Sequence, residues 1–169
     1  MQTLSLVIRL AVLVALLSLA VVDVRERRLP TRQVLIIGAL FYVDALVMRM
    51  PIAAVLEHTL IALAAFAVCA LLFALKMLGG GDAKLASIVF LWAGAPLWLP
   101  ALMLISVIGT AVSLVSLATR RINPHRRTRL AAALALFSGA RGVPYGVALA
   151  LGGGTVIVLP AALPLFLSR

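Results

Sequence analysis

The sequence is poor in charged and chemically reactive side chains. Of its 169 residues, 5 are Asp or Glu, 2 are His and 1 is Cys. The single Cys69 excludes an internal disulfide, and there is no cluster of cysteines to hold zinc. Charged residues make up 12% of the chain, where a soluble domain averages about 25%. This shortage argues against a soluble enzyme, a disordered tail and a secreted disulfide-stabilised domain.

Long apolar runs take the place of the missing charge. Apolar residues make up 64% of the chain, against about 45–50% in soluble domains. Because one bilayer span takes about 20 apolar residues, we predict an all-α integral membrane protein with six transmembrane helices. The connections are too short for a separate soluble part, so residues 1–169 form a single membrane-embedded domain. The predicted spans are 3–22, 33–48, 52–75, 85–99, 101–118 and 143–167.

The basic residues are distributed unevenly between the two sides of this arrangement. The net charge is +10, and outside loops 23–32, 76–84 and 119–142 only Arg9, Arg49 and Arg169 are basic. The positive-inside rule therefore places the three loops in the cytoplasm and both termini outside it. No continuous basic face is present, so nucleic acid is not expected as a partner.

Two of the few acids fall at the same depth. Asp23 ends the first span and Asp82 opens the fourth, both at the cytoplasmic side, whereas Asp44 and Glu57 belong to the opposite half of the membrane. A carboxylate within a span costs about 2.5–3.5 kcal/mol and is a functional candidate. Simpler roles remain open, because Asp82 follows the glycines 79–81 as a helix N-cap would, and Asp23 can pair with a neighbouring arginine.

Two carboxylates at one depth can hydrolyse a peptide bond. Like charges a few ångströms apart cannot both ionise, so the pair would hold one proton. The charged member would take a proton from water, which attacks the carbonyl carbon, while the protonated member donates to the carbonyl oxygen. This chemistry needs no metal and no covalent nucleophile. It also suits a sequence without G-x-S-x-G, Cys–His or zinc-binding motifs.

Three segments resemble the type IV prepilin peptidase family. Residues 23–30 read Asp-Val-Arg-Glu-Arg-Arg-Leu-Pro, similar to the family's first motif, in which Pro follows Asp seven residues later. Residues 79–85 read Gly-Gly-Gly-Asp-Ala-Lys-Leu, similar to the second motif, G-x-G-D-x-K-L. Residues 143–148 are similar to the segment that opens the last span. One departure is Thr31, which stands where the family usually has Asn.

The resemblance implies an aspartic endopeptidase with Asp23 and Asp82 as the catalytic pair and no metal or cofactor. Lys84 is expected to tune the pKa of Asp82, to contact substrate, or simply to be a cytoplasmic basic residue. Tyr145 is expected to line the site or to belong to an interfacial aromatic belt. The candidates for substrate-binding or supporting roles are Gly79, Gly81, Lys84, Pro30 and Tyr145.

The resemblance also implies a substrate and a location. The enzyme would lie in the bacterial inner membrane and cleave its substrate at the cytoplasmic face. The substrate would be a prepilin, which consists of a basic leader followed by an apolar helix, and the enzyme would remove the leader. Bifunctional members of the family carry a methyltransferase part with a cysteine cluster. Because Cys69 is alone, the chain looks like the short, peptidase-only form found with Flp/Tad-type pili.

Three other functions remain open. An intramembrane G-x-G-D protease with other substrates would have its first aspartate deep in a span. A small proton-coupled transporter would have acids near the bilayer midplane and an inverted repeat. A non-catalytic membrane assembly factor would tolerate replacement of both aspartates. Two structural expectations complete the analysis: the glycines 152–154 permit close helix packing, and Trp92 and Trp98 belong to an external aromatic belt.

Overall fold

The part of the protein that the structure describes is built from helices alone, as the sequence predicts. A computed structural model describes residues 1–26, 29–119 and 145–167, with side chains up to residue 162 in the last range. No strand occurs in these ranges. The helices are α1 (Gln2–Glu26), α2 (Thr31–Val47), α3 (Ile52–Ala74), α4 (Gly80–Thr119) and α6 (Tyr145–Leu167).

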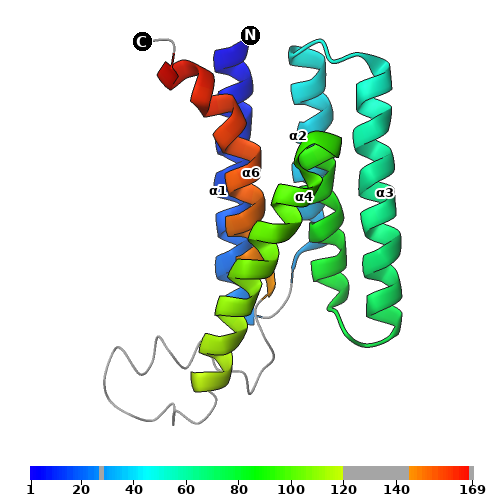
Figure 1. Ribbon diagram of the computed structural model, residues 1–169, viewed down its shortest axis with the longest axis vertical. Coiled ribbons are helices and arrows are strands. Elements are labelled where there is room, and N and C mark those ends of the chain that lie inside the picture. The colour runs from blue at the N-terminus through cyan, green and yellow to red at the C-terminus, as the bar shows by residue number, and fades with distance from the viewer. Residues whose placement is uncertain (27–28, 120–144, 168–169) are drawn as a thin grey trace.

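The helices have the length and composition of membrane spans. Four of them, α1, α3, α4 and α6, are long and apolar enough to cross a bilayer, whereas α2 has only 17 residues. Figure 1 shows that α1 begins and α6 ends at the same end of the bundle. The count of six spans and the side of the termini stay predictions. The basic segments 27–28 and 120–144 lie outside the described residues.

The predicted fourth and fifth spans form one element, α4, with a sharp kink. The sequence analysis put the break between them at residues 99–101, beside a proline, but the backbone leaves the helical region at Gly94, with φ 60° and ψ −171°. Figure 1 shows α4 rising from one end of the bundle and returning toward it. The imidazole of His58 lies against Gly94, and its Nδ1 is 2.8 Å from the carbonyl oxygen of Leu91. This contact satisfies a carbonyl near the interruption, where helical bonds are missing.

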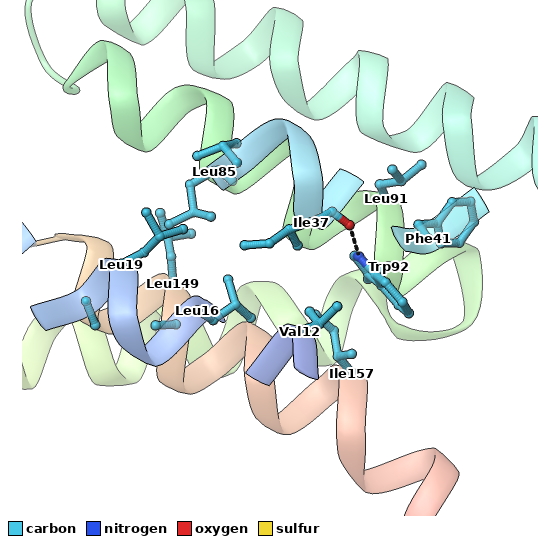
Figure 2. Close-up of a cluster of buried hydrophobic side chains, with 14 residues drawn as sticks. Val12, Leu16, Leu19, Ile37, Phe41, Leu85, Leu91, Trp92, Leu149 and Ile157 are labelled. Carbon is cyan, nitrogen blue, oxygen red and sulfur yellow. Dashed lines mark hydrogen bonds between the residues drawn. The ribbon is translucent and has the colours of Figure 1, made fainter. Parts of the chain in front are cut away.

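The core joins α1, α2, α4 and α6. Its side chains interdigitate between these helices, as Figure 2 shows for Leu16, Ile37 and Leu149. Helix α3 buries no side chain fully and packs on α4. Trp92 corrects an expectation, because it is 4% exposed in this core and not in an external belt. Its Nε1–H donates to the carbonyl oxygen of Ile37 over 3.1 Å, a partner that makes indole burial favourable.

The glycines of α6 bring neighbouring helices close, as predicted. A Cβ on Gly152 would lie 3.0 Å from the backbone nitrogen of Ile105 in α4, and one on Gly153 would lie 2.7 Å from Val89 Cγ1. Real Cβ atoms do not approach so closely without displacing their neighbours. The two halves of α4 therefore both pack tightly on α6, and this fixes the start of α6 relative to α4.

A partly buried ion pair ties three helices together. Arg9 Nη2 of α1 is 2.9 Å from Asp44 Oδ2 of α2, and Arg9 Nη1 donates to the Ile157 carbonyl of α6 over 3.0 Å. The guanidinium also lies 5.6 Å from the centre of the Trp92 ring. Asp44 is therefore a structural partner of Arg9, a role that the sequence alone did not reveal.

Candidate functional site

Three helix ends lie at the same end of the bundle, and two of them carry the predicted catalytic residues. Asp23 belongs to the last turn of α1 and Asp82 to the first turn of α4. Figure 1 shows both of these helix ends, and the start of α6, at the end of the bundle opposite the N-terminus. Asp44 and Glu57 lie toward the other end, in the last turn of α2 and near the start of α3. The structure thus separates the acids into the same two groups as the sequence pattern.

Asp23 is held against the start of α6. It is 7% exposed, and its Oδ2 accepts a hydrogen bond of 2.9 Å from the backbone N–H of Gly146. The first N–H groups of a helix lack helical partners and carry a partial positive charge, which favours an anion. A Cβ at position 146 would lie 2.7 Å from that same oxygen. Glycine is therefore needed for the carboxylate to reach the helix end.

Asp82 folds back over the glycines that precede it. Helix α4 begins at Gly80, so Asp82 lies inside the first turn, whereas an N-cap lies just before it. A Cβ on Gly79 would lie 2.7 Å from Asp82 Oδ2. On the other side, Phe73 of α3 packs on Gly80, and Cys69 lies within electrostatic range of the Asp82 carboxylate. The G-x-G-D segment thus gives Asp82 room on one side and support on the other.

Two contacts join the segments that carry the aspartates. A Cβ on Gly81 would lie 2.9 Å from Leu29 Cβ. This glycine therefore allows the connection between α1 and α2 to approach α4 closely. One turn further, Lys84 Nζ donates to Thr31 Oγ1 over 3.1 Å. Thr31, the residue that departs from the family pattern, therefore supplies an oxygen acceptor of its own. These contacts hold the 29–31 turn against the start of α4.

The remaining predicted residues lie at the same end of the bundle. Pro30 precedes α2 with φ −64°, which suits a helix start. Tyr145 begins α6 and is 39% exposed. The sequence analysis missed Gly146 as the partner of Asp23 and Leu29 as the partner of Gly81. The Pro-Tyr-Gly segment at 144–146 drew attention to the right place, but no local pattern indicates that a backbone N–H is the functional group.

The described part of the chain offers no site for a metal ion. No three His, Cys, Asp or Glu side chains in it lie close enough together to hold one. The groups that the structure places at the aspartate end include carboxylates, backbone N–H groups, the Thr31 hydroxyl and the Lys84 amine. The catalytic roles of Asp23 and Asp82 and the supporting roles of the other residues stay predictions.

Comparison with known proteins gives one match. The family model described as the type IV leader peptidase family matches residues 10–114. This range includes both Asp23 and Asp82, the kink at Gly94 and most of the second half of α4. Searches of curated proteins and of solved structures give no significant match.

Proposed function

The chain belongs to the type IV leader peptidase family, and we propose that it is a membrane aspartic endopeptidase that removes the leaders of Flp/Tad-type prepilins. Its place would be the bacterial inner membrane, with the active site at the cytoplasmic face. The observation that carries the proposal is the arrangement around the aspartates. Asp23, at the end of α1, contacts the start of α6. Asp82 lies in the first turn of α4, and Leu29 and Thr31 contact the segment around it.

We assign the role of general base to Asp23 and that of general acid to Asp82. The Asp23 carboxylate accepts a hydrogen bond from the Gly146 N–H at the start of α6, and a helix start attracts an anion. Asp23 would take a proton from water, whose oxygen attacks the peptide carbonyl carbon. Asp82 would protonate the carbonyl oxygen. The tetrahedral diol then loses the amine as the C–N bond breaks, a proton passes to that amine, and Asp82 regains its own proton.

The location of the pair suits a substrate that is half in the membrane. The aspartates lie at helix ends, next to loops with many arginines and lysines, so the proposed site is at the bilayer surface. A prepilin would keep its apolar helix in the bilayer and its basic leader in the cytoplasm. The bond between the two would then reach the aspartates without pulling the apolar helix out of the lipid.

The test is leader removal in cells that express the chain together with a candidate prepilin. Asp23→Asn and Asp82→Asn should each abolish cleavage, because an amide can neither accept nor donate the proton that the reaction needs. Glu57→Gln, the same change at an exposed acid of α3, should leave cleavage unchanged. Membrane fractions should contain all three variants in equal amounts. Continued processing by either aspartate variant would refute the catalytic pair.

A chelator experiment separates this mechanism from metal-dependent hydrolysis. We expect cleavage by the purified enzyme to continue in EDTA, because the proposed reaction needs only the two carboxylates. Loss of cleavage in EDTA, with recovery on addition of zinc, would contradict the aspartic mechanism. If no prepilin is cleaved while other membrane peptides are, the wider intramembrane G-x-G-D protease function would replace the prepilin-specific one.

A further inference from the structure

The second half of α4 carries hydroxyl groups along one face. Ser106, Thr110 and Ser113 follow each other at intervals of three or four residues, which places them on one side of the helix. They line a groove of about 430 Å³ together with Tyr145 at the start of α6, Gly109, and the apolar side chains of Ile105, Leu114 and Leu117. The three hydroxyl residues belong to the part of α4 that returns toward the aspartate end of the bundle (Figure 1).

The hydroxyl face borders the face of the helix that packs on α6, where Gly109 also lines the groove, and it lies away from an exposed apolar face. Gly109 faces α6, since a Cβ there would lie 3.6 Å from Ala148 Cβ. Val107 and Val115 are exposed and lie about 100–180° round the helix from Ser106, at 3.6 residues per turn. That apolar face suits lipid tails. Lipid tails cannot form hydrogen bonds, so the hydroxyl face suits a polar occupant.

The groove borders the segment that contacts the proposed general base. Tyr145, which lines it, is followed directly by Gly146, whose N–H bonds the Asp23 carboxylate. An occupant of the groove would therefore meet the active site at this end. The second groove near the site, between α2 and α3, has a similar volume of about 430 Å³ but is lined mainly by apolar residues such as Leu35 and Phe66.

We infer that the hydroxyl-lined groove binds the stretch of the substrate chain around the cleaved bond, in an extended conformation. The inference rests on the proposed function. The peptide bond that is cleaved must lie outside a helix. The backbone N–H and C=O groups of the adjacent substrate residues then need hydrogen-bond partners at membrane depth. Hydroxyls can donate and accept. Thr110 Oγ1 donates to the Ser106 carbonyl over 2.8 Å, which leaves its lone pairs as acceptors for a substrate N–H.

Photo-crosslinking locates the substrate directly. A photoreactive residue replaces Ser113, Val115 or Phe66 in full-length Asp82→Asn enzyme, so that a co-expressed prepilin is held uncleaved. We expect a prepilin adduct from position 113 and little or none from 115, on the lipid face, or from 66, in the α2–α3 groove. Adducts from 66 but not from 113 would overturn the inference in favour of the α2–α3 groove. Adducts from 113 to a second copy of the enzyme, with none to prepilin, would overturn it as well.

Kinetics test whether the hydroxyls bind. A triple variant, Ser106→Ala, Thr110→Val and Ser113→Ala, should raise KM for a prepilin about tenfold and leave kcat nearly unchanged, which corresponds to about 1.4 kcal/mol of lost binding. Thr110→Ser, which keeps a hydroxyl, should retain the wild-type KM. The double variant Val107→Ala and Val115→Ala is the matched control on the lipid face and should behave as wild type.

The outcomes separate this inference from the proposed function. If wild-type enzyme cleaves prepilin, the aspartate variants do not, and the triple variant keeps the wild-type KM, the groove assignment fails and the protease assignment stands. If wild-type enzyme cleaves no prepilin, or either aspartate variant still does, both assignments fail together.

Discussion

At the scale of single residues, the site depends on places where a side chain is missing. Gly79 and Gly146 each lie against a carboxylate, and a Cβ at either position would be 2.7 Å from an aspartate oxygen. The two glycines lie in different helix-start regions and serve different aspartates. A different glycine therefore makes room for each carboxylate, and a substitution at one glycine should disturb the conformation of one aspartate only.

Gly146→Ala tests the contact at Asp23. The new Cβ would collide with Asp23 Oδ2 and also lie 3.0 Å from Asp23 Cβ, so the carboxylate must leave the α6 N–H. We expect kcat for prepilin cleavage to fall about tenfold or more, equivalent to about 1.4 kcal/mol of transition-state stabilisation. Gly154→Ala is the matched control in the same helix, because its Cβ would meet only the flexible tip of Leu13. Wild-type activity in Gly146→Ala would contradict the role of this contact.

The buried aspartates also show how one residue type takes two roles. Asp23 has a backbone N–H as partner, whereas Asp44 has the full positive charge of Arg9. This difference in partners distinguishes Asp23, a candidate catalytic residue, from Asp44, a structural one, since both are almost fully buried.

At the scale of elements, α2 is attached to the bundle by polar contacts as well as by its apolar face. Asp44 binds Arg9, the Ile37 carbonyl accepts from Trp92, and Thr31 accepts from Lys84. These three contacts lie near the end, the middle and the start of the helix. In a bilayer such bonds replace part of the hydrophobic drive that holds soluble helices together.

Removing one member of the Arg9–Asp44 pair should destabilise the bundle. Arg9→Met or Asp44→Leu alone leaves a buried charge without its partner, and we expect a loss of about 3–5 kcal/mol. The double variant should be more stable than either single variant. Thermal unfolding of the purified proteins in detergent measures this. Additive losses in the double variant would show that the two residues do not act as a pair.

The kink in α4 depends on Gly94 in the same way that the site depends on Gly79 and Gly146. Its φ of 60° and ψ of −171° belong to a region that is almost exclusive to glycine and costs other residues about 1–3 kcal/mol. A Cβ there would also collide with the His58 ring. Gly94→Ala should therefore lower the melting temperature, whereas Ala95→Gly at the exposed neighbouring position should change it less.

The sequence predicted the helices better than their junctions. Apolar runs and the prolines indicated a break between the fourth and fifth spans, but the break lies at Gly94 because His58, from another helix, packs there. Trp92 was expected in an external aromatic belt. The group that accepts its indole N–H, the Ile37 carbonyl, is 55 residues away in sequence and could not be recognised from the local pattern. Both errors concern contacts between helices, for which a single sequence has no local signal.

At the scale of the whole molecule, the same limit applies to the site. The motifs predict catalytic roles for Asp23 and Asp82 because each motif is a local pattern of residue types. The partner of Asp23 is a backbone N–H that is 123 residues away, and a backbone group leaves no trace in residue type. The pairing of Asp44 with Arg9 over 35 residues is hidden for a similar reason, since many arginines were available.

The predicted topology of the chain rests on the charge distribution and can be tested as a whole. Cys69 is the one cysteine in the sequence, so a Cys69→Ala background allows single cysteines to be placed at Met50, between α2 and α3, and at Met77, between α3 and α4. The positive-inside rule places the Met77 turn, beside Lys76 and Lys84, in the cytoplasm. We expect a membrane-impermeant thiol reagent to label Met50→Cys in spheroplasts and Met77→Cys only after the membrane is opened.

The labelling result bears directly on where cleavage occurs. Asp82 is only five residues from Met77, so the side of the membrane that exposes position 77 also faces the proposed active site. Each cysteine variant must still remove the prepilin leader, which shows that its topology is native. If Met77→Cys were labelled from outside and Met50→Cys from inside, the aspartates would face away from the cytoplasm. A leader held in the cytoplasm by its basic residues could then not reach them, and cytoplasmic processing would be ruled out.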